Sequence, residues 1–342
     1  MTTVQGLRAS PWAYPLQLAA DRRSIGVLAL SEADYAAASF LDERLASSTN
    51  KPGWLDWRSL EAAAAGIRGE SDFIFHIGHV GSTLLSRLLG RHPGIFALRE
   101  PAILRTLTAE QADPAFAERL AVMLRLYARV WRPDQRSLVK ATSFVADIGS
   151  DILALFASAV AILIFVAPQV FIATILAGDA TRAELAHVTP WRLARLAQRL
   201  AGARLAPAST IGEMAAAGWA CEMAALAGVA LSSPDRVLWV DFDRLLSDPR
   251  GGLSRIMRRL RPGESEDAVA FMLDGPELGQ YSKAPEHPFD AEARQAMIDR
   301  AMRVYRDEIE RGLAWLDATG AAHPAIARAS RAAAIGRTSI PR

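Results

Sequence analysis

The stretch that decides the fold is Phe73-Ile74-Phe75-His76-Ile77-Gly78-His79-Val80-Gly81-Ser82-Thr83-Leu84-Leu85. Its first five residues are apolar except for one histidine, which is typical of a buried strand, and the leucines after Thr83 fall at helical spacing. The two glycines of the turn can adopt positive φ and leave room for an incoming ligand. A strand, such a turn and a helix aim backbone N–H groups and the positive end of the helix dipole at one point. We therefore expect an anion-binding loop made of Gly78, His79, Val80, Gly81, Ser82 and Thr83.

This loop differs from two common nucleotide-binding motifs. A Walker A loop needs Gly-x-x-x-x-Gly-Lys-Ser/Thr, in which the lysine reaches the β- and γ-phosphates. The present loop has shorter spacing and no lysine. It is not Gly-x-Gly-x-x-Gly either, which disfavours a dinucleotide-binding fold. The pattern predicts a phosphate cradle that works without a kinase-type lysine.

Strands and helices alternate along most of the chain. Apolar strands are predicted at residues 24–30, 73–77, 94–98, 137–142, 159–166 and 236–241. Helices are predicted at residues 31–45, 59–65, 114–131, 147–156, 169–177, 190–205, 211–227, 249–260, 266–273 and 290–316. Strands that are apolar throughout indicate a parallel sheet with both faces covered. The sequence predicts an α/β, three-layer P-loop-type fold with a central, mainly parallel sheet flanked by helices.

Three regions are expected along the chain. Residues 1–70 precede the loop-bearing core and are predicted to be an N-terminal extension packed on it. Residues 71–319 form the predicted P-loop domain. Residues 320–342 are rich in alanine and arginine with no apolar stripe, so we expect a flexible tail.

Composition excludes several classes of function. The net charge of +2 over 342 residues gives no basic surface for wholesale nucleic-acid binding. Cys221 is the only cysteine, so neither an internal disulfide nor a multi-cysteine metal site can form. Its helical neighbours predict a buried, inert thiol.

Residues 152–178 carry no charge and are long enough to be mistaken for a membrane span. Pro168 would break a continuous helix there, and residues 159–166 favour a strand. We expect a buried strand followed by a helix, and no membrane span. The N-terminus has no apolar core of signal-peptide length, so we expect a cytoplasmic protein.

The motifs resemble those of the sulfotransferases. The family's strand–loop–helix reads roughly Gly-x-x-Arg-Ser-Gly-Thr-Ser/Thr-Leu-Leu, and His92-Pro93 and Arg99-Glu100-Pro101 are similar to its downstream His-Pro and Glu-Pro pairs. Leu138-Val139-Lys140 resembles the family's strand that ends in lysine. Residues 161–174 look like its strand–helix for the nucleotide 3′-phosphate, and Asp243-Arg244-Leu245 with Asp248-Pro249 resembles a later segment. The match spans about residues 72 to 285.

The resemblance implies transfer of a sulfuryl group from 3′-phosphoadenosine 5′-phosphosulfate (PAPS) to a hydroxyl or amine, with no metal required. The loop amides with Ser82 and Thr83 would hold the 5′-phosphosulfate and stabilise charge on the leaving phosphate. Glu100 follows a predicted strand and is the candidate base that takes the acceptor's proton. His79 occupies the place of the family's loop Arg or Lys, and it would supply charge as imidazolium or act as a base when neutral. His76 lies within the strand and is predicted to be a core histidine.

Lysine is rare here, because Lys51, Lys140 and Lys283 are the only three among 39 basic residues. Lys140 ends a buried strand, where an unpaired ammonium would be costly, so we expect it beside the bridging oxygen of the leaving group. Lys283 resembles part of the late loop that closes over the nucleotide.

The chain departs from the family where the 3′-phosphate binds. The arginine and serine expected there are Val166 and Thr174, and a second common arginine is Gln169. Thr174 keeps a hydroxyl donor, whereas Val166 cannot bind phosphate. Either Arg182 or Arg192 compensates from a later helix, or the ligand lacks a 3′-phosphate.

Three functions therefore stay open. The first is a PAPS-dependent sulfotransferase. The second is an ATP- and Mg²⁺-dependent phosphotransferase, in which Asp241 would hold the metal. The third is a catalytically silent nucleotide-binding or partner-binding protein. The acceptor, whether a small molecule, carbohydrate or peptide, is expected between residues 1–70 and the helices at 182–227.

Overall fold

The computed structural model describes residues 4–280 and 290–327. At its centre lies a five-stranded sheet with the strand order β5-β6-β4-β7-β8, in which all paired strands run parallel. The strands are β4 (Ser71–His76), β5 (Ile95–Arg99), β6 (Arg136–Lys140), β7 (Ala161–Phe165) and β8 (Val237–Asp241). Every residue of β4, β5 and β7 is buried. The predicted α/β fold with a central parallel sheet is confirmed.

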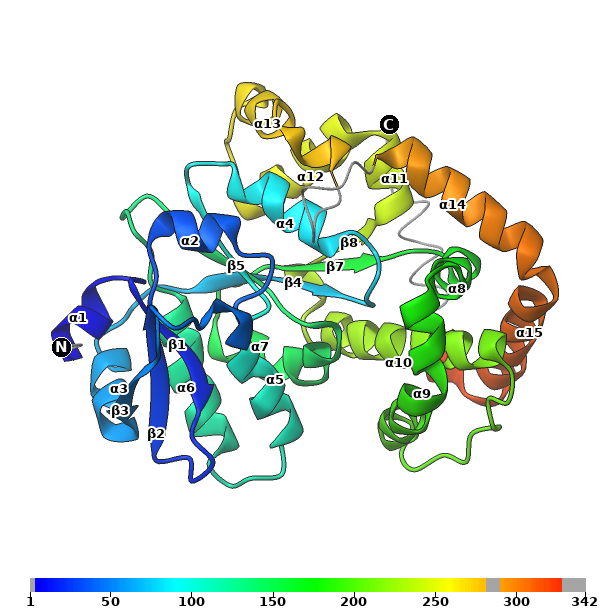
Figure 1. Ribbon diagram of the computed structural model, residues 1–342, viewed down its shortest axis with the longest axis horizontal. Coiled ribbons are helices and arrows are strands. Elements are labelled where there is room, and N and C mark those ends of the chain that lie inside the picture. Colours follow the sequence, from blue (N-terminus) through cyan, green and yellow to red (C-terminus); the bar gives the residue numbers. More distant parts are fainter. Residues whose placement is uncertain (1–3, 281–289, 328–342) are drawn as a thin grey trace.

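Helices cover both faces of this sheet, so that the protein has three layers. Figure 1 shows α4 and α12 above the sheet and α7 and α10 below it. The helices of the core are α4 (Ser82–Gly90), α5 (Ala102–Ala109), α6 (Phe116–Tyr127), α7 (Gly149–Leu155), α8 (Pro168–Ala177), α10 (Ile211–Ser232), α11 (Phe242–Ser247), α12 (Pro249–Leu260) and α13 (Glu266–Leu273). Short 3₁₀ turns complete the connections, at η2 (Ser143–Ile148), η3 (Pro234–Arg236) and η4 (Pro276–Gly279). Because the strands are parallel, their carboxyl ends meet at one edge of the sheet.

A separate antiparallel sheet precedes the core. Its strand order is β1-β2-β3, and only the middle strand was predicted from the sequence. The elements of this region are α1 (Val4–Ala9), β1 (Ala13–Leu18), β2 (Ser24–Ala29), α2 (Glu32–Ala37), η1 (Glu43–Leu45), β3 (Gly53–Asp56) and α3 (Trp57–Ala64). That residues 1–70 form an N-terminal extension packed on the core stays a prediction.

The helix predicted at residues 31–45 was wrong beyond Ala37. Ser31 begins it with a capping box, as the sequence suggested, but α2 ends after six residues. The Arg99 guanidinium donates to the carbonyls of Tyr35 and Ala38, which occupies the last turn of α2. Leu41 then donates its N–H to the Arg99 carbonyl at 2.7 Å. The Arg99 side chain therefore caps the end of α2, and the Arg99 carbonyl pairs with Leu41, so the chain after Ala37 does not continue the helix.

The uncharged segment 152–178 forms the end of α7, then β7 and α8, as predicted. Pro168 stands in the first turn of α8, where its missing N–H costs nothing.

Among the described residues, only the helix α10 is long and apolar enough to cross a membrane, and 67% of its apolar window is buried inside the protein. It packs against α8, α9 (Asp179–Arg199) and α15 (Arg306–Ala322). Cys221 lies on α10, and burial raises the pKa of its thiol to about 12, as expected for an inert cysteine.

Two of the later helices differ clearly from the prediction. The helix predicted at 190–205 is α9, which begins eleven residues earlier and carries Pro190 in its interior. The helix predicted at 290–316 is split at Tyr305 into α14 (Ala291–Val304) and α15. The tail predicted from residue 320 stays a prediction for 328–342, whereas α15 continues to Ala322 and Ile326 is fully buried.

Candidate functional site

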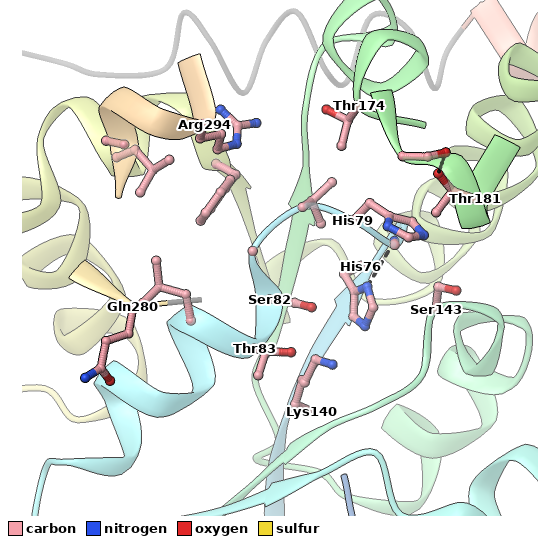
Figure 2. Close-up of a pocket in the computed structure, with 18 of the residues that line it drawn as sticks. His76, His79, Ser82, Thr83, Lys140, Ser143, Thr174, Thr181, Gln280 and Arg294 are labelled. Atoms are coloured by element: carbon pink, nitrogen blue, oxygen red, sulfur yellow. Dashed lines mark hydrogen bonds between the residues drawn. The ribbon is translucent and has the colours of Figure 1, made fainter. Parts of the chain in front are cut away.

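A cavity of about 480 Å³ opens at the edge of the sheet where β4 and β6 end. Figure 2 shows the side chains that surround it. The predicted loop forms part of its wall, and elements far apart in sequence supply the rest. Its lining residues include Phe40, His76, Gly78, His79, Val80, Gly81, Ser82, Thr83, Glu100, Lys140, Thr142, Ser143, Thr174, Thr181, Phe242, Gln280, Asp290 and Arg294.

The loop has the backbone conformation that a phosphate cradle needs. Gly78, His79 and Gly81 all have positive φ, at 81°, 52° and 65°. Gly81 is the N-cap of α4, so the helix begins at Ser82 and its first amides face the loop. His79 tolerates this left-handed conformation less easily than glycine, which marks a strained position at the site.

Gly81 is also required by packing. A Cβ placed on it would lie 1.8 Å from Cζ of Phe242, the first residue of α11. The phenyl ring thus lies directly against the loop backbone. No larger residue fits at position 81 without displacing this ring.

The hydroxyls at the start of α4 are buried. Ser82 and Thr83 are 5% and 2% exposed. In the part of the chain that the structure describes, the buried Oγ1 of Thr83 has no hydrogen-bond partner. A buried hydroxyl without a partner is rare in folded proteins. Together with the loop amides, it makes a donor set that fits a tetrahedral anion.

His76 supports the loop from below. Its Nδ1 accepts from the Gly78 N–H at 3.0 Å, and Nε2 lies 2.9 Å from the Ala141 carbonyl. Because a carbonyl only accepts, Nε2 carries the proton and the ring is the neutral Nε2–H tautomer in this arrangement. The prediction of a buried, hydrogen-bonded histidine is confirmed, and the ring additionally ties the loop to the end of β6.

Glu100 and Lys140 meet at the adjoining ends of β5 and β6. The Lys140 ammonium donates to Oε1 of Glu100, and the Lys140 side chain is fully buried. The Thr142 hydroxyl donates to Oε2 of Glu100 at 3.1 Å. Glu100 has φ 52°, and its N–H donates to the Lys140 carbonyl at 2.6 Å. Glu100 thus lines the cavity, and these contacts hold its carboxylate beside Lys140.

Not all of the other predicted site residues line the cavity. His79 is exposed on the cavity rim, and Thr174 lines the cavity while its hydroxyl donates to the Val170 carbonyl at 2.8 Å. Val166 is buried, and its carbonyl accepts from the Trp219 indole N–H. Lys283 lies outside the described residues.

Neither arginine suggested as a substitute lines the cavity. Arg182 donates to the Leu176 carbonyl and to Asp179, and Arg192 packs against Gly218. Sequence reasoning missed Arg294, which does line the cavity from α14. A signal for it existed, because Arg294, Ile298 and Ala301 share the buried face of a helix that is otherwise polar.

Among the described residues, no group of three or more His, Cys, Asp or Glu side chains is arranged to hold a metal ion. Asp241, considered as a magnesium ligand, ends β8 and accepts the Asp243 N–H at 3.0 Å as the N-cap of α11. It does not line the cavity.

Comparison with known proteins finds similarity to solved structures alone. No family model matches the chain. No curated protein matches it. The sulfotransferase domain from the curacin biosynthetic pathway is 14% identical, with a TM-score of 0.43 and coverage of 70% of this chain and 99% of that one.

Two further solved structures are similar. Sulfotransferase STF9 from Mycobacterium avium is 13% identical, with a TM-score of 0.39 and coverage of 70% and 78%. The sulfotransferase domain of the Synechococcus PCC 7002 olefin synthase is 18% identical, with a TM-score of 0.39 and coverage of 70% and 95%. All three of these solved structures are of sulfotransferases or sulfotransferase domains.

Proposed function

We propose that this protein is a sulfotransferase that moves a sulfuryl group from PAPS to a hydroxyl or amine of an acceptor. The observation that carries the proposal is one cavity holding both a lysine-free phosphate loop and the buried Lys140–Glu100 pair. The loop offers amides and hydroxyls to an anion, and the pair offers a base and a cation beside it. In-line transfer without a metal needs these three components.

Glu100 takes the proton from the acceptor. As the acceptor oxygen or nitrogen forms its bond to sulfur, its proton passes to the Glu100 carboxylate. The Thr142 hydroxyl holds the second carboxylate oxygen and keeps the group oriented. Phe40 belongs to the part of the chain before the core. Its ring centre lies 6.0 Å from Nζ of Lys140, and the ring would border the acceptor.

Lys140 and the loop stabilise the leaving group. The bond between sulfur and the bridging oxygen breaks, and its electron pair goes to the 5′-phosphate of 3′-phosphoadenosine 5′-phosphate (PAP). The Lys140 ammonium beside that oxygen and the amides at Gly81 and Ser82 balance the new charge. The unsatisfied Thr83 hydroxyl would gain its partner there.

The role of His79 stays open between a cation and a base. Its place on the loop and its exposure suit a contact to phosphosulfate oxygens. A His79→Arg variant separates the two roles, because arginine replaces a cation and cannot replace a base. Retained turnover in this variant assigns His79 as a cation.

The two alternatives lack comparable support. A phosphotransferase would need a loop lysine and a metal ligand, whereas Asp241 is engaged in capping α11. A silent binding protein has no need for a buried lysine and glutamate paired in the wall of the cavity, since burying that pair costs free energy.

Thermal unfolding with PAP, ADP, or ADP plus Mg²⁺ tests the proposal. We expect PAP to raise the melting temperature well above the effect of ADP. A preference for ADP that depends on Mg²⁺ would support the phosphotransferase, and no shift with any nucleotide would support the silent protein. Release of PAP from PAPS with a panel of phenols, sugars and amines then measures transfer directly.

A further inference from the structure

An exposed tryptophan on α9 stands beside the cavity. Trp191 is 48% exposed, and its ring centre lies 5.4 Å from that of Phe144 in η2, at an interplanar angle of 83°. Single exposed hydrophobic residues are common on protein surfaces and need no explanation. The aromatic platform formed by Phe144 and Trp191 differs from them in two respects, which are its connection to the cavity and its fixed geometry.

Both elements that carry the aromatic platform also line the cavity. Ser143, the residue before Phe144, is one of the lining residues, and so is Thr181 in the first turn of α9. Figure 2 shows Ser143 and Thr181 on one side of the cavity, away from Arg294. The platform therefore continues the wall of the cavity on this side.

A buried ion network holds the indole in place. The Arg195 guanidinium lies over the Trp191 ring, 4.4 Å from its centre. Its Nε lies 2.7 Å from Oδ2 of Asp147, and its Nη1 lies 2.8 Å from Oε1 of Glu222. Because these charge-assisted bonds fix the guanidinium, the indole is oriented before a ligand arrives, which lowers the entropic cost of binding. The two carboxylates also balance the charge of Arg195, so the platform does not call for an anionic ligand.

Neither of these two neighbours covers the second face of the indole. The Arg195 guanidinium lies 5.9 Å from the centre of the Phe144 ring, which is too close for partners on opposite faces of Trp191. Arg195 thus occupies one face, and Phe144 flanks an edge. The exposure of Trp191 is consistent with a second face that is open to solvent.

The surroundings of the platform suit a saccharide better than an aromatic acceptor. One face of a sugar ring presents C–H groups, which pack on the negative face of an aromatic ring. His187 and Glu184 lie one and two turns before Trp191 on the same side of α9, and both are exposed. Together with the Ser143 and Thr181 hydroxyls, they can form hydrogen bonds with sugar hydroxyls. An aromatic acceptor would need an enclosed apolar slot instead.

We propose that Trp191 and Phe144 form the acceptor subsite and that the acceptor is a neutral saccharide of at least two linked sugar units. The inference rests on the proposed function. One unit would stack on the open face of Trp191, and a hydroxyl of another unit would reach Glu100. Thr142, which donates to Glu100, stands two residues before Phe144, a stretch of at most about 7 Å. Because neither ring of the platform lines the cavity, a single sugar unit does not reach both places.

Release of PAP from PAPS tests this inference. The acceptors are glucose, galactose and N-acetylglucosamine, each as its methyl glycoside and as a disaccharide and tetrasaccharide, with phenol and 2-naphthol for comparison. For the best sugar, we expect kcat/KM to be at least tenfold higher for the disaccharide than for the monosaccharide. Trp191→Ala should raise KM for the disaccharide about tenfold and change kcat little, so that this ratio falls towards one. Trp191→Phe keeps an aromatic face and should lie between the two.

Trp54→Ala is the matched control. Trp54 is 53% exposed and lies on β3, on the opposite side of the molecule from α9 in Figure 1. Its replacement should leave KM for the disaccharide unchanged. Melting temperature and PAP affinity show whether Trp191→Ala keeps its fold and its nucleotide site. If both fall and KM rises equally for monosaccharide and disaccharide, Trp191 has only a structural role and the inference is wrong.

The other outcomes separate the inference from the proposed function. Transfer to phenol or 2-naphthol but to no saccharide would overturn the inference and leave the sulfotransferase proposal standing. Equal kcat/KM for monosaccharide and disaccharide, or a ratio that Trp191→Ala leaves unchanged, would do the same. No release of PAP with any acceptor would also overturn the inference, and the thermal shift with PAP would then decide whether the nucleotide part of the proposed function stands.

Discussion

The Lys140 ammonium and the Glu100 carboxylate form an ion pair inside the protein, at the ends of two neighbouring strands. Arg99 and Lys140 stand opposite each other in the ladder between β5 and β6, so Glu100 leaves its strand just beside Lys140. The left-handed backbone at Glu100 keeps its side chain at this edge. Two residues that lie 40 positions apart thus meet because parallel strands end together.

Loss of either partner of this ion pair should lower turnover, whereas stability should depend on which partner is lost. Lys140→Met leaves the Glu100 carboxylate without its cation, and we expect it to lower the free energy of unfolding by about 3–5 kcal/mol. Glu100→Gln keeps an oxygen that accepts from Lys140, so its stability should fall less. Both variants should lose about 10²- to 10⁴-fold in PAPS turnover. Urea unfolding and release of PAP measure the two effects, and turnover that survives both changes would refute the assigned roles.

Thr142 is expected to position Glu100. Thr142→Val removes the hydroxyl that donates to Oε2 of Glu100 while keeping the shape of the side chain. We expect turnover to fall roughly tenfold, in line with the loss of one hydrogen bond to a charged group. Thr142→Ser keeps the donor and should restore most of the rate. Equal rates in the Val and Ser variants would show that the hydroxyl has no part in turnover, and PAP affinity reports whether binding changed instead.

Sequence reasoning predicted the central sheet and its loop better than the N-terminal sheet. The strand before Gly78 was recognisable because its residues are apolar except for His76, and the loop because two glycines stand between a strand and a helix. Parallel order then brings Glu100, Lys140 and the loop to one edge without further information. The N-terminal sheet was missed because β1 and β3 are short and contain proline or glycine.

The end of the cavity at Arg294 could not be predicted in the same way. Arg294 follows the loop by more than 200 residues, and its place on the cavity wall depends on how α14 packs against α8. Arg182 and Arg192 were nearer in sequence to the missing contacts, yet backbone carbonyls and neighbouring helices engage them. Local patterns report local structure, whereas the partner of a guanidinium depends on the tertiary fold.

Gly81 should not tolerate even one added methyl group. Gly81→Ala meets the Phe242 ring at 1.8 Å and also strains a backbone with φ 65°. We expect a loss of about 2–4 kcal/mol in unfolding free energy, from strain and overpacking together, and a sharp drop in PAP affinity. Gly202→Ala is the matched control, because φ there is 79° and no heavy atom lies within 4 Å of the added Cβ. It should cost only the backbone strain, about 1 kcal/mol. Equal losses in the two variants would contradict the packing argument.

His92 should make the stability of the fold depend on pH near neutrality. Its ring is buried, Nδ1 accepts from the Gly94 N–H at 3.0 Å, and Nε2 lies 3.2 Å from Oε2 of Glu264. Burial lowers the pKa of His92 below its usual 6.5, although the Glu264 carboxylate opposes this shift. The unfolded chain therefore takes up a proton at a higher pH than the folded protein does.

The free energy of unfolding should accordingly fall as the pH drops below about 6.5, and this contribution should level off below the folded pKa. His92→Asn offers an oxygen to the Gly94 N–H but cannot take up a proton, so its stability should depend less on pH over this interval. Urea unfolding of both proteins between pH 8 and pH 5.5 measures the difference, which cancels contributions from the other histidines. Wild-type and variant curves that stay parallel across the interval would show that His92 does not titrate differently in the two states.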